Sequence, residues 1–79
     1  PRIKLCCDTC HVFSAGYDPV WYLQQILPWT KLIHYNDCEV CRGCCADRHA
    51  IPGMGKIGPD RMIQVLQIAA SQGIPCVRE

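Results

Sequence analysis

The chain has 79 residues, a length that allows at most one small domain. Its formal net charge of +1 gives no strong electrostatic field that would indicate a nucleic acid or a membrane surface as partner. The sequence has no run of about 18 apolar residues, so it predicts no transmembrane helix. Because the chain lacks an initiator methionine and ends on the strand-like stretch PCVRE, we expect a fragment of a larger fold.

The chain has eight cysteines in 79 residues, and so high a cysteine content is typical of disulfide-stabilised secreted domains. Cys6, Cys7 and Cys76 nevertheless lie in apolar runs, where cysteine behaves as a small buried hydrophobic residue. The first residues, PRIKLCC, also lack the apolar core of a signal peptide. We therefore expect reduced cysteines and an intracellular location, cytoplasmic or nuclear.

Two apolar runs in the first half of the chain predict strands, near residues 3–8 and 31–35. Between them, Asp18 followed by Pro19 predicts the start of a helix, because aspartate caps helices and proline fits the first helical position. This helix is expected near residues 19–27, where the next proline ends it. The residues between the first strand and Asp18 are expected to form a loop.

The second half of the chain predicts a long loop, a helix and a third strand. The loop is expected over residues 37–58, and a stripe of apolar residues predicts a helix near 59–72. Gly73 fits the end of this helix, and the last strand is expected near 75–78. Strands that alternate with helices indicate the α/β class, here a β-α-β-α-β unit with a parallel sheet and right-handed crossovers.

Each predicted strand ends at or near a side chain that commonly binds metals. These residues are Asp8, His34 and Glu79. In parallel α/β folds the functional site lies at the carboxyl ends of the strands, so the three side chains are expected on the same side of the sheet. The sequence therefore predicts a metal site there.

The predicted loops contribute further candidate ligands, His11, Asp47 and His49. Either histidine alone is more often a capping or surface residue than a ligand. Six candidate ligands on one side of a sheet nevertheless favour more than one cation, and paired divalent ions are typical of phosphate-ester hydrolysis. The glycine-rich stretch 52–58 runs up to a helix start and could present backbone N–H groups to a phosphate, although such glycines more often only form a turn.

The cysteine-rich stretch before Asp47 offers a competing interpretation, because its spacing could hold zinc or an iron–sulfur cluster. Its cysteines are Cys38, Cys41, Cys44 and Cys45. A structural zinc site would need a second set of ligands, and Cys6, Cys7 and Cys10 could provide it. Cys6 and Cys7 are adjacent in the first strand and point to opposite faces, so at most one of them could join such a site.

Four stretches of the sequence resemble the motifs of the endonuclease IV family of abasic-site endonucleases, in the same order along the chain. The stretches are CCDTCHVFSAGYD, LIHYND, ADRHAIPGMGKIG and IPCVRE. The resemblance implies a (β/α)8 TIM barrel whose mouth binds three zinc ions. Residues 1–79 would then be the C-terminal part of a single TIM-barrel domain and would supply its last three strands.

The same resemblance assigns the six candidate ligands to zinc ions. Asp8, His34 and Glu79 match ligands of the paired zinc ions, a site that is only partly present in this chain. The complete protein ligand set of the third zinc is matched by His11, Asp47 and His49. No catalytic residue beyond the metal ligands is expected in this chain.

The resemblance also implies an activity, which is zinc-dependent hydrolysis of the phosphodiester on the 5′ side of an abasic site by metal-bound hydroxide, in DNA base excision repair. The expected partner is double-stranded DNA with abasic sites, with no membrane partner. The full-length protein would be a monomer, and the fragment alone would be inactive.

The chain departs from the family pattern at several positions, and two other functions stay open. Met54 stands where an acidic residue is usual, Glu39 where lysine is frequent, and the cysteines that follow it are not part of the motif. The first alternative is a metal-dependent sugar isomerase or epimerase-like barrel, which would have a polyol-sized pocket and no affinity for DNA. The second is a non-catalytic cysteine-zinc module.

Overall fold

The structure is a computed structural model that describes residues 4–46 and 48–78. The elements, in chain order, are β1 (Leu5–Asp8), α1 (Thr9–Ser14), α2 (Pro19–Ile26), the 3-10 helix η1 (Leu27–Trp29), β2 (Thr30–His34), β3 (Asp37–Cys38), β4 (His49–Ala50), α3 (Pro59–Gln72) and β5 (Cys76–Val77). The three predicted strands and the two predicted helices are all present near their expected positions. No described helix has both the length and the apolar character needed to cross a membrane.

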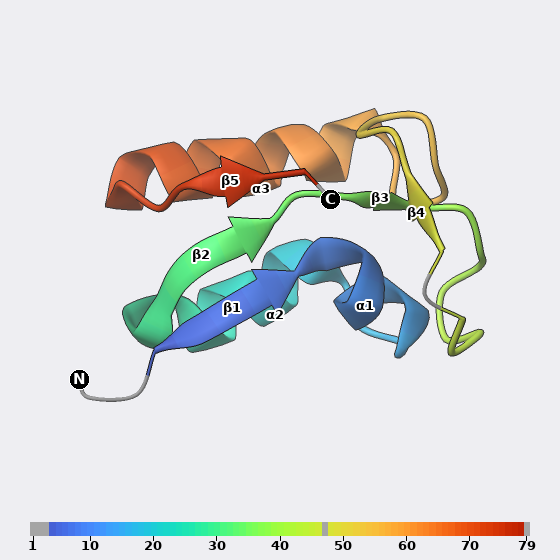
Figure 1. The fold of residues 1–79 in the computed structure, drawn as a ribbon, viewed down its shortest axis with the longest axis horizontal. Helices are drawn as coiled ribbons and strands as arrows, with labels where there is room; N and C mark the ends of the chain where they lie inside the picture. The colour runs from blue at the N-terminus through green and yellow to red at the C-terminus, as the bar shows by residue number, and fades with distance from the viewer. Residues whose placement is uncertain (1–3, 47, 79) are drawn as a thin grey trace.

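The main sheet has three parallel strands in the order β1-β2-β5 (Figure 1). The pairing of β1 with β2 places Asp8 directly beside His34, the last residues of the two strands. The pairing of β2 with β5 then places His34 beside Val77. The carboxyl ends of all three strands therefore meet at one edge of the sheet, as the sequence predicted.

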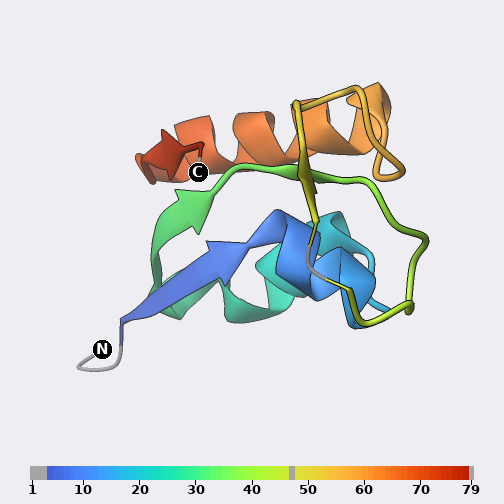
Figure 2. The same cartoon turned by 45° about the vertical axis from the view of Figure 1, so that its right-hand side comes forward.

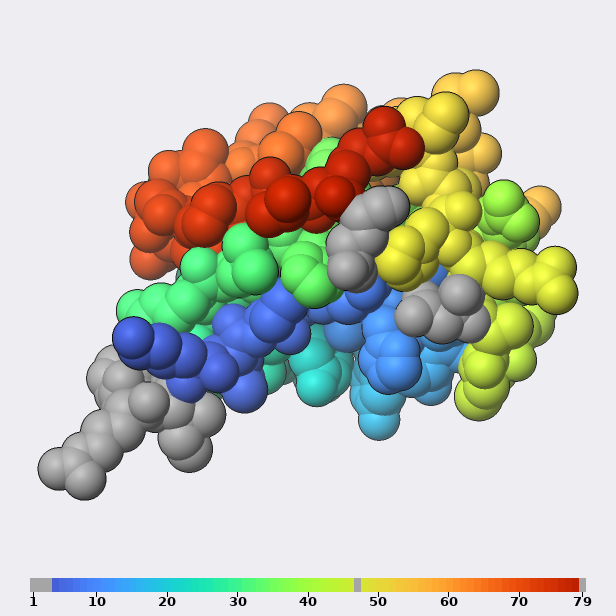
Figure 3. Space-filling view, in the orientation of Figure 1, coloured from blue at the N-terminus to red at the C-terminus, as the bar shows by residue number. Residues whose placement is uncertain are grey.

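Helices α2 and α3 cover one face of this sheet, and no helix of the described residues lies on the other face (Figures 1 and 2). The core lies between the sheet and the helices and includes Cys7 from β1, Leu23 from α2, Ile33 from β2 and Val65 from α3. In the space-filling view the three strands form the surface of the opposite face (Figure 3). In a closed barrel this uncovered face would point to the interior.

The prediction of a loop after β1 is wrong, because the residues that directly follow β1 form helix α1. The cause is local: the Asp8 carboxylate accepts a hydrogen bond from the backbone N–H of His11 at 3.0 Å and thereby caps the helix. The sequence indicates Asp8 only as a candidate ligand. In the structure the same side chain also starts helix α1.

The expected loop over 37–58 is also more ordered than predicted. Its first two residues form β3 and pair with β4, which lies further along the same segment, as antiparallel strands, with Asp37 opposite Ala50 and Cys38 opposite His49. Residues between these strands make backbone hydrogen bonds to the end of α1, including Cys45 N–H to Ser14 O at 2.7 Å. The cysteine-rich stretch therefore packs against the end of α1.

The expectation of reduced cysteines fails for one pair, because Cys41 and Cys44 form a disulfide in the structure. A turn in which Cys44 N–H donates to Cys41 O brings their Cα atoms to 5.6 Å, within the usual range for disulfides. Cys38 and Cys45 keep their thiols, so no disulfide joins this loop to the strand cysteines within the described residues. That part of the sequence interpretation is confirmed.

We predict that the isolated 79-residue chain is poorly folded or self-associated in solution. The sheet has an open edge on each side and an uncovered face on which Val77 is exposed, and a chain of this size has little surplus stability. Amide dispersion in NMR spectra and the concentration dependence of melting test this prediction. Sharp, well-dispersed amides with a cooperative, concentration-independent melt would contradict it.

We also predict that Cys7 resists alkylation in the folded full-length protein. Burial raises the pKa of this thiol to about 12, and the neighbouring Asp8 and Cys6 add to the rise. The reactive thiolate is then a fraction of only about 10⁻⁴ at pH 8. Mass spectrometry after iodoacetamide treatment should find exposed Cys45 labelled and Cys7 unlabelled. Equal labelling rates for the two would show that Cys7 is not in a packed core.

Candidate functional site

The candidate site centres on the carboxylate of Asp8, at the end of β1. One oxygen, Oδ1, accepts the capping hydrogen bond from His11 N–H. The other oxygen, Oδ2, lies between two imidazoles, 3.6 Å from Nε2 of His49 and 3.9 Å from Nδ1 of His34. The three side chains are each between one-fifth and one-third exposed, so an ion or a substrate can reach them.

Separate elements bring the two histidines to Asp8. His34 arrives through the parallel register of β1 and β2, in which it is the direct neighbour of Asp8. His49 arrives through the β3–β4 pairing, in which Glu39 N–H donates to Arg48 O at 2.9 Å. The sequence placed both histidines on the same side of the sheet, and the structure brings both to one oxygen.

The ends of β1 and β2 are also joined through the hydroxyl of Thr9. It accepts a hydrogen bond from the backbone N–H of Asn36 at 3.0 Å and lies 2.6 Å from the carbonyl oxygen of Asn36. Thr9 is completely buried, so water does not compete for these bonds. This contact fixes the segment after His34 against the residue after Asp8.

The donor atoms around Asp8 are of the kinds that zinc prefers, but their spacing is not that of a formed metal site. Zinc in proteins binds carboxylate oxygen and imidazole nitrogen at about 2.0–2.2 Å, which puts two donors of a tetrahedral site about 3.3–3.6 Å apart. Asp8 and His34, which the resemblance assigns to the paired ions, are 3.9 Å apart and so lie slightly outside this range. Within residues 4–46 and 48–78, no group of three or more histidine, cysteine, aspartate or glutamate side chains is already arranged to hold a metal.

The remaining candidate ligands are placed differently. His11 lies exposed on α1, and its backbone N–H, as described above, bonds to Asp8. Asp47 and Glu79 lie outside the described residues. The proposed grouping of His11, Asp47 and His49 around one ion therefore stays a prediction, as does the role of Glu79.

A cysteine cage does not form among the described cysteines. The Cys41–Cys44 disulfide occupies two of the four sulfurs of the cysteine-rich stretch. Cys38 is completely buried in a small apolar cluster with Phe13 and Ile57, and Cys45 is exposed. These sulfurs are therefore part of the packing or of the loop surface.

A hollow of about 410 Å³ opens beside His49. Its walls include Ile51 and Met54 from the segment after β4, Glu39 from the segment after β3, and Arg78, which directly follows β5. Arg78 supplies a positive charge and Met54 a highly exposed apolar side chain. The hollow adjoins a candidate ligand, so it is the place where a substrate could lie.

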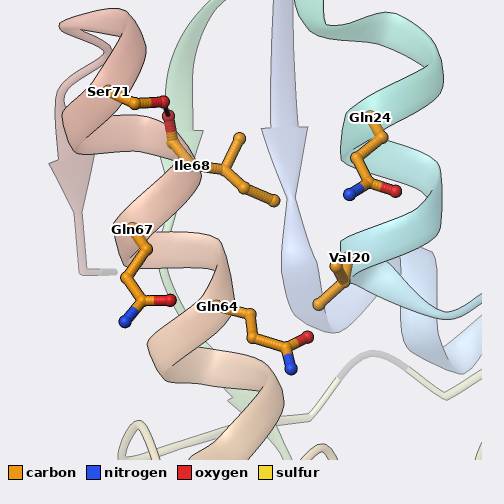
Figure 4. A pocket seen from close by; sticks show the side chains of 6 residues that line it. All are labelled: Val20, Gln24, Gln64, Gln67, Ile68 and Ser71. Carbon is orange, nitrogen blue, oxygen red and sulfur yellow. Dashed lines mark hydrogen bonds between the residues drawn. The ribbon is translucent and has the colours of Figure 1, made fainter.

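A second groove, of about 310 Å³, lies between α2 and α3, away from the strand ends (Figure 4). Val20 and Gln24 line it from α2, and Gln64, Gln67 and Ile68 line it from α3. It contains no ionisable side chain. Its position on the helical layer and its neutral lining give it no evident catalytic chemistry.

Sequence reasoning missed one residue that shapes the site. Asp37, in the first position of β3, is completely buried, and its carboxylate accepts hydrogen bonds from four backbone N–H groups, those of Cys38, Gly53, Ile57 and Gly58. The available signal was an aspartate next to a strand followed by a glycine-rich segment. The partners lie up to 21 positions away, so spacing alone could not identify them.

Curated relatives that match this chain are named "Probable endonuclease 4". The relative from Acholeplasma laidlawii is 34% identical over 87 residues, that from Methanoculleus marisnigri 33% over 89 and that from Streptomyces avermitilis 37% over 90. Each match covers 99% or more of this chain but only 29–32% of the relative. The chain therefore spans about a third of the length of these relatives.

A solved structure gives the same result for the fold. Endonuclease IV from Thermus thermophilus superposes with a TM-score of 0.85 at 29% sequence identity, over 96% of this chain and 31% of that one. The family model described as "Xylose isomerase-like TIM barrel" matches residues 1–79, the whole chain. The resemblance to endonuclease IV and the barrel fold expected from it are thereby confirmed, and the chain belongs to the Xylose isomerase-like TIM barrel family.

Proposed function

We propose that the full-length protein is a zinc-dependent endonuclease that hydrolyses the phosphodiester on the 5′ side of abasic sites in double-stranded DNA. The observation that carries the proposal is the Asp8 carboxylate between the imidazoles of His34 and His49, at the strand ends of a chain that matches endonuclease 4 proteins along nearly all its length. This activity would serve base excision repair. The acting unit would be a monomer containing the complete barrel.

The residues that would hold zinc fall into two groups. Asp8, His34 and Glu79 would contribute to a pair of ions, and His11, Asp47 and His49 would form the site of a third. When bound, zinc supplies Lewis-acid stabilisation of the negative charge that develops on a phosphodiester. The remaining ligands of the paired ions would come from barrel strands other than the three described here.

The chain's own residues prepare this site before an ion or a substrate arrives. The hydrogen bond from His11 N–H fixes Oδ1 of Asp8, so Oδ2 is left facing the two imidazoles. The Thr9 hydroxyl holds the segment after β2 in place, and with it the end of the strand that carries His34. Such preorganisation reduces the reorganisation that charge stabilisation would otherwise require.

The hollow beside His49 would receive the part of the DNA next to the reacting phosphate. Arg78 would attract the phosphodiester backbone, and the exposed apolar Ile51 and Met54 would contact the sugar at the site of the lost base. The small net charge of this chain means that most backbone contacts would come from the rest of the barrel.

An enzyme that repairs chromosomal DNA would work in the cytoplasm or the nucleus. Disulfides are uncommon in these compartments, and the Cys41–Cys44 bond departs from that pattern. The proposal does not require this disulfide, because the carboxylate and imidazole donors come from other residues.

We predict that replacing His49 by alanine in the full-length protein lowers zinc content and reduces nicking of abasic DNA more than about 100-fold, since loss even of a group that supports a ligand costs about 10–100-fold. The triple change of Cys41, Cys44 and Cys45 to serine should leave the zinc content and the nicking rate nearly unchanged. Zinc content by mass spectrometry and nicking of an abasic duplex are measured side by side. Binding of the abasic duplex should fall far less than turnover.

The alanine variant and the triple serine variant also distinguish the endonuclease from the two alternative functions. A cysteine-zinc module predicts the reverse result, with zinc lost in the serine variant and kept in the alanine variant. A sugar isomerase-like barrel predicts zinc loss in the alanine variant but no nicking and no DNA binding by the unchanged protein. Either result would refute the endonuclease proposal.

A further inference from the structure

The Asp37 carboxylate is completely buried and is saturated by backbone N–H groups. Oδ1 accepts from Cys38 N–H and Ile57 N–H, both at 2.8 Å, and Oδ2 accepts from Gly53 N–H at 3.0 Å and Gly58 N–H at 3.3 Å. Within the described part of the chain, no basic side chain pairs with it. A buried charge is costly unless its hydrogen bonds are satisfied, so these four donors are what makes this position tolerable.

The start of α3 adds to this stabilisation. Gly58 is the N-cap of this 14-residue helix and has no side chain to cap it, and its N–H points to Asp37 Oδ2. The positive end of the helix dipole lies there and favours a carboxylate. The Asp37 side chain thus joins β3 to the first turn of α3.

The segment held by Asp37 runs directly from His49 to α3. Residues 51–58 leave β4, turn through the hydrogen bond from Met54 N–H to Ile51 O and return to β3, where Lys56 N–H donates to Cys38 O at 2.7 Å. On the β3 side, Cys38 is the register partner of His49. His49 is therefore fixed from both sides, by the strand that begins at Asp37 and by the segment that closes on the Asp37 carboxylate.

Gly55 shows how closely this segment packs. A Cβ atom at this position would lie 2.5 Å from the carbonyl oxygen of Cys38 and 2.6 Å from Oδ1 of Asp37. Real Cβ atoms do not approach so near to backbone atoms, so any side chain here would push the segment away from β3. Substitution of Gly55 therefore disturbs the contact without removing the carboxylate.

We infer that Asp37 is a positioning residue, which through its four backbone hydrogen bonds holds the His49 imidazole at Asp8 and shapes the hollow lined by Ile51 and Met54. It does not face the hollow or the Asp8 carboxylate, so it is not itself a ligand or a catalytic residue. The expected effect on zinc affinity rests on the proposed function. The claim that Asp37 positions the His49 side chain does not rest on it.

The test uses three variants of the full-length protein. Asp37→Asn keeps one acceptor oxygen but turns an NH2 group toward two of the four backbone N–H donors, and Gly55→Ala displaces the segment. Gly73→Ala is the matched control, because Gly73 ends α3 at φ +66 with nothing within 4 Å, so alanine there costs backbone stability far from the site.

We predict that Asp37→Asn and Gly55→Ala shift the imidazole NMR resonances of His49, assigned with His49→Ala. Zinc affinity from chelator competition should fall about 10–100-fold in both variants, as for other groups that orient a ligand. Gly73→Ala should lower the melting temperature but leave the resonances and the affinity unchanged. The inference is overturned if Asp37→Asn lowers the melting temperature but changes neither the His49 resonances nor the zinc affinity.

Two further results keep the test decisive. In the unchanged protein, the amide hydrogens of Gly53 and Ile57 should exchange slowly with solvent; fast exchange would mean that Asp37 does not hold the segment, even if both variants fail to fold. If the unchanged protein neither binds zinc nor nicks DNA, the proposed function fails. The His49 resonances then still decide whether Asp37 positions this side chain.

Discussion

The parallel register of β1 with β2 is the constraint on which the site depends. It makes Asp8 and His34 neighbours at the ends of their strands, and a shift by one residue would turn one of the two side chains to the opposite face. The packed core fixes this register, because Cys7 and Ile33 must face the helices. Packing on one side of the sheet thereby determines the chemistry at its edge.

The second constraint is the β3–β4 pairing, which adds His49 to the site. Both strands have only two residues, and such a short pair is not stable by itself. It is stabilised by the Asp37 carboxylate on one side and by packing of Cys38 against Phe13 and Ile57 on the other. The site therefore combines a rigid sheet edge with a segment held by one buried charge.

The sequence predicted the regular elements well but not the local anchors. Helices α2 and α3 carry their signals nearby, in Asp18-Pro19 and in an apolar stripe ended by Gly73. Helix α1 was missed because its cap, Asp8, was interpreted only as a candidate ligand. The role of Asp37 was missed because its hydrogen bonds reach residues 16–21 positions away, a pairing that only the folded chain creates.

The most direct test of this account is to locate zinc by anomalous diffraction at the zinc edge in crystals of the full-length protein. The account predicts an anomalous peak within about 2.0–2.2 Å of Asp8 Oδ2 and of an imidazole nitrogen of His34. A zinc peak bound to Cys41, Cys44 and Cys45, with none at the strand ends, would contradict it.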